Sequence, residues 1–570
     1  MRNSSSGTTL KLRAIGGLHV VTLAWDFLPA QEAAHTDLLG FAIERSEFKN
    51  GQEVERFFLR GLKRFKGKDA GLAPGTLVPT SEHPVQSFQW GDYTVQPGTT
   101  YRYRVVPAYG KPKLLQLNDA AAVAVEITTE SEVERDTGSG VPRHSIYFNR
   151  GAAGSQAYAR RFEDPTPDEN DPESDQMKWL SRGLYEGLRD FIEHATGPDA
   201  GDYGLRGMFY EFRYLPVAKL LSKARKAGAD VALRYEAQTY KKHNVATIQQ
   251  AKIASIAKPQ KSRAGIRHNK FIVLLHKGSP KAVWTGSTNI SAGGIFGHSN
   301  VGHVVWDDEV ATRFMDYWTA LADPDVTRGD LVAANRAVQA TPQAGQLPPA
   351  GSIWTLFSPR DDQVKDESPT MDWYAQLFAG AKRVACMTFA FNLDAVFENA
   401  LARKDATLRF AVFDKNIGRP LEEQFRISRN ALIAVGDKFD AGELENFKPE
   451  ALTGFNRNLY IHDKFLLVDP LGTDPIVVTG TANFSHASQK NNDENMLVIR
   501  SNTRVADIYF GEFMRIFDHL YSRYVVRMIN EEGGSSKGGG FLKERTMDWL
   551  SGHLKPGSRK DLRRRYFVGG

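Results

Sequence analysis

Apolar and polar positions follow one pattern in the first part of the chain and another in the rest. Short apolar runs in the first 135 residues alternate with a period of two, as in Val21, Leu23 and Trp25, and turn residues such as Pro97 and Gly98 separate such runs. This alternation places every second side chain on one face of a strand. The N-terminal segment is therefore predicted to form a β-sandwich.

After a polar, acidic stretch, helices and strands are predicted to alternate. Residues 184–192 place apolar side chains on one helical face, and two strands at 208–212 and 231–235 flank a helix at 216–227. The same order returns between residues 374 and 413. Alternation of this kind indicates α/β layers, so the fold class that we expect is a multidomain chain, a β-sandwich followed by two α/β repeats.

One motif occurs twice in the α/β part. Residues 268–289 and 462–483 align without a gap, at an offset of 462 − 268 = 194 residues. Each copy begins with His-x-Lys, continues with two apolar runs, and ends with Gly-Ser/Thr-x-Asn. The paired positions are His268 with His462, Lys270 with Lys464, Asn289 with Asn483, and Ser291 with Ser485. The two apolar runs suit two buried strands that are joined by a turn.

This double motif resembles the phospholipase D superfamily, and the resemblance covers roughly residues 140–525. In that family each repeat supplies half of one active site, and the halves meet across a pseudo-twofold axis. The resemblance implies catalytic roles for His268, Lys270, Asn289, His462, Lys464, Asn483 and Glu494. It implies substrate-binding or supporting roles for Ser291, Asn300, Ser485 and Asp469.

The residue types of the motif suit phosphodiester chemistry. The lysines offer positive charge and the asparagines offer side-chain NH groups to the non-bridging oxygens. One neutral imidazole can attack phosphorus to form a phosphohistidine, and the opposite imidazolium can protonate the leaving oxygen. Since the lysines neutralise the developing charge, neither a metal nor a cofactor is expected.

An asymmetry between the repeats predicts which histidine does what. Glu494 occupies the family position of the acid that orients the histidine, and the equivalent position in the first repeat is Asn300. A carboxylate partner raises the pKa of a histidine, whereas an amide does not. We therefore expect His462, with Glu494 behind it, to be the general acid. His268, with Asn300 behind it, is expected to be the nucleophile.

A second asymmetry concerns an aspartate that follows the lysine in this family. Asp469 fills the position in the second repeat, but Leu275 stands there in the first. In the family this aspartate is chiefly structural, so its loss leaves the chemistry intact. Leu275 and Asn300 also support a rival hypothesis, a binding protein whose catalytic fold has decayed. Both histidines and both lysines argue against that hypothesis.

Four segments are expected. Residues 1–135 resemble a fibronectin type III domain, on the strength of residues 92–105 and a core tryptophan, Trp25. The two phospholipase D-like repeats are expected at 140–345 and 346–530. Residues 531–570 are predicted to be a Gly/Ser linker and a solvated, basic C-terminal tail, since the sequence there is rich in Gly and then in Arg.

Composition leaves the substrate open. The chain has 570 residues, a net charge of +6 and a pI of about 9.0, which suits a phospholipid surface or nucleic acid. A phospholipid headgroup is the preferred substrate, a metal-independent nuclease is the alternative, and hydrolysis and transfer to an alcohol both stay open. No signal peptide or spanning segment is predicted, so we expect a soluble, cytoplasmic protein by default, with signal-independent export left open.

Other candidate sites are weaker. His276, His298 and His303 lack the spacing of a zinc motif and are expected to be turn or surface residues. Cys386 lies in an apolar run and is expected to be a core residue. No metal site is predicted.

Overall fold

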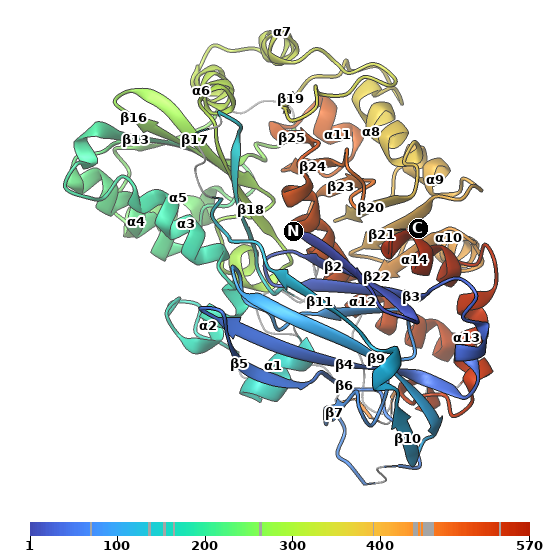
Figure 1. The fold of residues 1–570 in the computed structure, drawn as a ribbon. Coiled ribbons are helices and arrows are strands. Elements are labelled where there is room, and N and C mark those ends of the chain that lie inside the picture. The colour runs from blue at the N-terminus through green and yellow to red at the C-terminus, as the bar shows by residue number, and fades with distance from the viewer. Residues whose placement is uncertain are drawn as a thin grey trace.

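The computed structural model, shown in Figure 1, describes most of the chain. The described residues are 1–68, 71–134, 138, 140–151, 155–163, 166–261, 265–391, 393–436, 443–444, 446–447, 461–534 and 537–569. Parts of the predicted boundary after residue 134, and Ser535 and Ser536 of the predicted linker, lie outside them.

The N-terminal segment folds into two antiparallel sheets. The strand order of the first sheet is β1 (Arg2–Ser6), β2 (Leu10–Gly16), β3 (Val21–Phe27) and β8 (Gln89–Asp92). The order of the second is β10 (Leu114–Leu117), β9 (Thr100–Lys111), β4 (Leu38–Lys49) and β5 (Gln52–Phe58), with β11 (Val123–Thr128) also paired to β9. A short pair, β6 (Arg60–Gly61) and β7 (Val78–Pro79), lies outside both sheets. Trp25 is buried in the core, as predicted, whereas the resemblance to fibronectin type III stays a prediction.

Two seven-stranded sheets with the same strand order follow. The first runs β12 (Arg143–Phe148), β18 (Val301–Trp306), β17 (Ser279–Gly286), β16 (Lys270–His276), β13 (Tyr203–Phe209), β14 (Asp230–Tyr235), β15 (Ala257–Pro259). The second runs β19 (Ile353–Ser358), β25 (Glu494–Arg500), β24 (Ile476–Gly480), β23 (Phe465–Val468), β20 (Val384–Phe389), β21 (Leu408–Phe413), β22 (Ala431–Val435). The predicted fold class is therefore confirmed, with two equivalent α/β repeats behind a β-sandwich.

Helices cover both faces of these sheets. The outer face of the first sheet packs against α1 (Ser155–Phe162), α2 (Asp175–Ser181), α3 (Leu184–Glu193), α4 (Leu215–Ala227) and α5 (Lys241–Gln250). The outer face of the second packs against α8 (Pro369–Ala379), α9 (Ala395–Leu401) and α10 (Arg419–Arg426). A short helix, α11 (His486–Lys490), follows the second motif. None of the described helices has both the length and the apolar character that crossing a bilayer requires.

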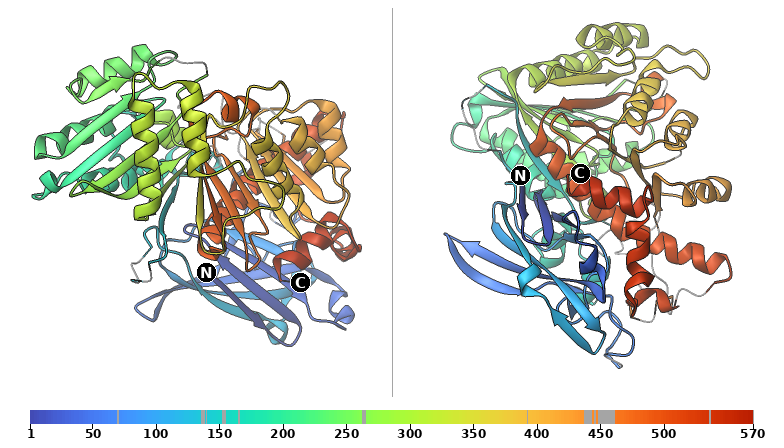
Figure 2. Two further views of the ribbon diagram at one scale, coloured as in Figure 1. Left: turned by 90° about the horizontal axis from the view of Figure 1, so that it is seen from above. Right: turned by 45° about the vertical axis from the view of Figure 1, so that its right-hand side comes forward.

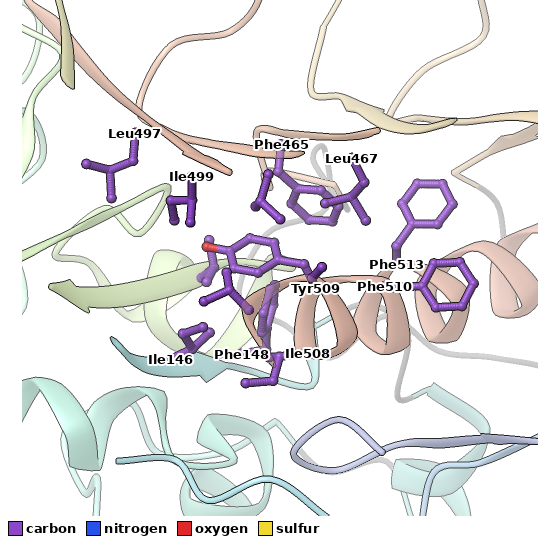
Figure 3. Packing of buried hydrophobic residues seen from close by; sticks show 14 of the residues in the cluster. Ile146, Phe148, Phe465, Leu467, Leu497, Ile499, Ile508, Tyr509, Phe510 and Phe513 are labelled. Carbon is purple, nitrogen blue, oxygen red and sulfur yellow. The ribbon is translucent and has the colours of Figure 1, made fainter. Parts of the chain in front are cut away.

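The inner faces of the two sheets share one hydrophobic core. It is filled by α6 (Asp308–Ala322), α7 (Arg328–Val338) and α12 (Thr503–Glu531), which lie between the repeats. Figure 3 shows Tyr509 and Phe513 of α12 beside Phe465 of β23, with Phe148 of β12 close by. Each fully buried aromatic side chain of this kind stabilises the fold by roughly 1.5–3 kcal/mol. The shared core therefore fixes the position of β16 relative to β23.

The C-terminal segment is not the solvated tail that its arginines predict. It forms α13 (Thr546–Leu554) and α14 (Arg559–Phe567), which pack against the sandwich and the second repeat (Figures 1 and 2). Trp549 enters the core of the sandwich, and Phe567 packs on Phe410 and Phe510. The prediction was wrong because apolar residues at helical spacing stand between the basic ones.

Trp549 makes the sandwich dependent on the far end of the chain, and this dependence is testable. Trp549 is 4% exposed, and its ring packs edge-on against Phe41 and donates its indole NH to the carbonyl of Leu38 at 3.1 Å. We expect Trp549→Ala to lower the free energy of unfolding by about 3–5 kcal/mol. Chemical denaturation followed by circular dichroism measures it.

The matched control is Met547→Ala on the same helix, because Met547 is 58% exposed. It should change stability by no more than about 0.5 kcal/mol. Equal effects of the two substitutions would contradict the placement of α13.

Candidate active site

The two motifs meet where the repeats exchange backbone hydrogen bonds. The amide of His268 donates to the carbonyl of Asp493 at 3.1 Å, and the amide of His462 donates to the carbonyl of Ser299 at 3.2 Å. These contacts belong to two parallel bridges, Arg267 with Asp493 and residue 461 with Ser299. The offset of 194 residues relates one bridge to the other, so the contact has local twofold symmetry.

The histidines are paired with residues of the opposite repeat. Nδ1 of His268 lies 2.8 Å from Oε2 of Glu494, and Nδ1 of His462 lies 2.9 Å from Oδ1 of Asn300. The pairing predicted from sequence, His462 with Glu494 and His268 with Asn300, is therefore wrong. The bridges give the reason: Glu494 follows Asp493, whose backbone joins the first repeat, so its side chain reaches His268.

The hydrogen bonds around Asn300 fix the tautomer of His462. The amide of Val301 donates to Oγ of Ser287, so the hydroxyl of Ser287 is free to donate to Oδ1 of Asn300 at 2.7 Å. The Nδ2 group of Asn300 donates to the carbonyl of Gly294 at 2.7 Å. Oδ1 must therefore accept, and Nδ1 of His462 carries the hydrogen. The lone pair of its Nε2 is left for chemistry.

Glu494 fixes His268 in the same way. Burial acts to raise the pKa of Glu494, but His268 and Lys270 outweigh it and hold that pKa below its usual value. The carboxylate is therefore charged, and it also accepts from Nδ2 of Asn492 at 3.3 Å. A charged carboxylate requires a donor on the facing nitrogen, so Nδ1 of His268 carries a hydrogen and Nε2 is again free.

The two histidines differ in basicity. Burial lowers the pKa of His268, and Glu494 opposes that shift. Burial also lowers the pKa of His462, and Lys464 and His298 add to the effect, so that it lies well below its usual value. His268 is therefore the more basic of the two imidazoles.

The lysines of the motifs lie beside the histidines. Nζ of Lys270 donates to the carbonyl of His268 at 2.6 Å, and Nζ of Lys464 donates to that of His462. Burial lowers the pKa of Lys270 to about 7, against the opposing effect of Glu494 and Glu211. Burial and the charge of Lys270 lower the pKa of Lys464 well below its usual value. An anion bound between the two lysines would favour their charged forms.

The side-chain oxygens of the motif asparagines are unpaired hydrogen-bond acceptors among the described residues. Oδ1 of Asn289 and Oδ1 of Asn483 are inaccessible and have no hydrogen-bond partner among the described residues. Nδ2 of Asn289 donates to Glu211 at 2.9 Å, and the backbone amide of Asn483 donates to Ser488. The two asparagines therefore share an unpartnered Oδ1, whereas the contact with the carboxylate of Glu211 is described for Asn289.

Three other predicted residues serve the backbone. Oγ of Ser291 accepts from the amide of Gly294, and Oγ of Ser485 caps α11. Asp469 follows the end of β23, whereas Lys464 precedes its start. The carboxylate of Asp469 accepts from three successive amides, those of residues 382–384, at the beginning of β20. The carboxylate anchors a strand at the far end of the sheet, which is the chiefly structural role that the resemblance implies, and a direct substrate-binding role is not supported.

The first repeat adds aromatic residues that sequence reasoning missed. The ring of Tyr210 lies 4.7 Å from that of His268 and 5.0 Å from Nζ of Lys270, and Tyr240 packs edge-on against it. Tyr210 and Glu211 directly follow the end of β13. Residues that follow the carboxyl end of a strand often form the site in α/β folds, so this position was a usable signal.

Two of the three extra histidines are not the turn or surface residues that the sequence predicts. His303 is fully buried and bonded to His144 at 2.8 Å, and His298 is 8% exposed. His276 packs against the ring of Tyr203. No group of three or more potential metal ligands occurs within the part of the chain that the structure describes.

A comparison with protein families finds a match in the second repeat. Residues 438–520 match the family described as "Cardiolipin synthase, PLD-like domain". The chain contains a phospholipase D-like domain. Among curated proteins, none matches.

Comparison with solved structures finds matches of low identity, with TM-scores below 0.5. Phosphatidylserine synthase of Haemophilus influenzae is 12% identical, with a TM-score of 0.41 over 62% of this chain and 91% of that one. Nuc of Salmonella typhimurium, a phospholipase D family member, is 18% identical, with a TM-score of 0.22 over 32% and 93%. Polyphosphate kinase of Porphyromonas gingivalis is 11% identical, with a TM-score of 0.39 over 66% of this chain, and only 60% of the kinase is covered.

The crossed pairing can be tested by titrating the histidines. Glu494→Gln removes the carboxylate that favours the imidazolium of His268, so the pKa of His268 should fall while that of His462 stays. Asn300→Asp should raise the pKa of His462. Nuclear magnetic resonance of histidine-labelled protein measures both.

His276 lies outside these contacts and provides an internal reference. If Glu494→Gln moved the pKa of His462 and left His268 unchanged, the pairing would be the reverse of the one described.

Proposed function

We propose that this chain is a phosphodiesterase that works through a phosphohistidine. The observation that carries the proposal is the pair of imidazoles described above. Both are buried, both have Nδ1 held by the opposite repeat, and neither Nε2 has a hydrogen bond to a residue that the structure describes. Two such nitrogens suit the two ends of an in-line displacement at phosphorus.

We assign His268 as the nucleophile, on a different ground from the one that the sequence suggested. The attacking imidazole gains positive charge as the bond between nitrogen and phosphorus forms. The carboxylate of Glu494 stabilises that charge, since it lies 2.8 Å from Nδ1. His268 is also the more basic ring, and basicity favours attack.

His462 then acts as the general acid. Its partner, Asn300, has no charge with which to hold the proton, so the imidazolium gives it up readily. A phosphodiester anion next to Lys464 offsets the repulsion that lowers the pKa of His462. Lys270, Lys464 and the two asparagines bind the non-bridging oxygens and supply the charge stabilisation that a metal ion supplies in other phosphodiesterases.

The reaction has two steps. Nε2 of His268 attacks phosphorus, the bond to the leaving oxygen breaks, and Nε2 of His462 protonates that oxygen. Water then attacks the phosphohistidine, His462 takes a proton from it, and the bond between phosphorus and His268 breaks. An alcohol in place of water gives transfer instead of hydrolysis.

The preferred substrate is a phospholipid headgroup. The family description that matches residues 438–520 names cardiolipin synthase, which supports a lipid phosphodiester.

A nuclease is the second candidate, and one cavity favours it. This cavity, of about 610 Å³, lies between the sandwich and α14, and Arg60, Lys560 and Trp90 are among its lining residues. Cations beside an aromatic ring suit single-stranded nucleic acid. Faster cleavage of single-stranded DNA than of phosphatidylcholine vesicles would overturn the lipid proposal.

The leaving group separates the roles of the two histidines. A p-nitrophenolate departs without a proton, but an alkoxide does not. His462→Ala should therefore keep the first release of p-nitrophenolate from a p-nitrophenyl phosphodiester, although later turnover is slowed at the water-activation step, and should lose roughly 10²–10⁴-fold on an alkyl diester. His268→Ala should lose activity on both, and burst and steady-state assays in excess EDTA measure these effects.

The parent protein in EDTA is the control for metal independence. The opposite pattern, with His268→Ala active on the p-nitrophenyl ester and His462→Ala inactive, would exchange the roles. Complete loss of the parent activity in EDTA, restored by one divalent ion, would remove the metal-independent mechanism.

A further inference from the structure

A third imidazole lies next to the reaction centre and is used by none of the steps above. His298 is 8% exposed, and its ring centroid lies 5.9 Å from that of His462, with the planes inclined at 54°. Its Nε2 is inaccessible and has no hydrogen-bond partner among the described residues. Buried polar atoms in proteins are usually paired, so an unpaired one beside a site calls for a ligand.

The backbone of His298 is firmly held. Its amide donates to the carbonyl of Gly293 at 2.8 Å across the π-helical turn Gly293–Gly297, and its carbonyl accepts from Nδ2 of Asn149 at 2.6 Å. The ring is therefore presented from a fixed point, and nothing in this arrangement occupies Nε2.

The equivalent residue of the second repeat makes different hydrogen bonds. The offset of 194 residues relates His298 to Asn492. Asn492 donates to Glu494 at 3.3 Å and accepts from the amide of Ile266 at 3.1 Å, so both ends of its side chain have partners and one of these is Glu494. His298 has no such task, and it flanks the histidine that handles the proton of the departing and entering oxygen.

The distance between the two rings suits one shared oxygen. Two imidazoles whose centroids are 5.9 Å apart are neither stacked nor directly bonded. A single oxygen with two N···O hydrogen bonds of about 2.8 Å each can bridge nitrogens up to roughly 5.6 Å apart. Burial, with Lys464 and Arg213, lowers the pKa of His298 to about 4. The ring is therefore neutral at neutral pH and can accept a hydrogen bond.

We propose that His298 is a catalytic residue that binds the attacking water in the second step and thereby favours hydrolysis over transfer. This inference rests on the proposed function. Water has two hydrogens: one goes to Nε2 of His462, and the other is held by Nε2 of His298, whose ring must turn toward the site to reach it, and stays on the phosphate product. The oxygen–phosphorus bond forms as the bond between phosphorus and His268 breaks. An alcohol has one hydroxyl hydrogen, which His462 takes, so it gains nothing from His298.

The test is the partition of the covalent intermediate between water and an added alcohol. A p-nitrophenyl phosphodiester is turned over in buffer that contains ethanol, and the hydrolysis and ethyl-transfer products are quantified. We expect His298→Phe to lower the ratio of hydrolysis to transfer by about tenfold, since one positioned hydrogen bond to the nucleophile is lost. The initial burst of p-nitrophenolate per folded molecule should be unchanged, because it reports the first step.

The ratio is internal to each sample, so partial misfolding of a variant does not alter it. His298→Asn restores an acceptor and should recover part of the ratio, and His276→Phe, outside the site, should leave it at the parent value. An unchanged ratio in His298→Phe would overturn the role of His298 while leaving the two-histidine mechanism in place. Absence of any ethyl-transfer product from both the parent and His298→Phe would instead contradict a covalent intermediate that an alcohol can capture, and with it the proposed function.

Discussion

Each histidine of this protein is positioned by the repeat to which it does not belong. Two parallel backbone bridges, 267 with 493 and 461 with 299, join the repeats at the start of their motif strands. Glu494 and Asn300 each follow one of these bridges, so each side chain reaches across the twofold axis to the opposite ring. Neither repeat alone can hold its own imidazole. The site therefore depends on the shared core around α6 and α12, which sets the distance between the sheets (Figure 3).

The backbone of the site is symmetric, but its side chains are not. The strand order and the bridges repeat at a constant offset. At equivalent positions, however, Glu494 corresponds to Asn300 and Asn492 corresponds to His298, and Tyr210 lies beside His268. A symmetric pair of imidazoles has no preferred direction of attack. These differences in charge and hydrogen bonding supply one, and they make His268 the more basic ring.

The sequence predicted the architecture well because its signals were local. Period-two runs gave the sandwich strands, and the double motif predicted two equivalent units. The partner of each histidine could not be predicted from local sequence. The alignment equates position 300 with position 494, but it does not say on which side of the axis either residue lies. The arginines of α14 led to the prediction of a solvated tail, but the segment is a helix whose Phe567 is fully buried. Burial, which depends on the whole fold, also distinguished His298 and His303 from surface histidines.

The central claim is that His268 forms the covalent bond to phosphorus, while His462 of the second repeat donates and accepts the proton. It is tested most directly by trapping the intermediate. His462→Ala would be mixed with a p-nitrophenyl phosphodiester, quenched in base to preserve phosphohistidine, digested and mapped by mass spectrometry. We expect the phosphoryl group on His268, where it accumulates because water activation is slowed. A phosphoryl group on any other residue, or rapid turnover with no covalent adduct, would contradict it.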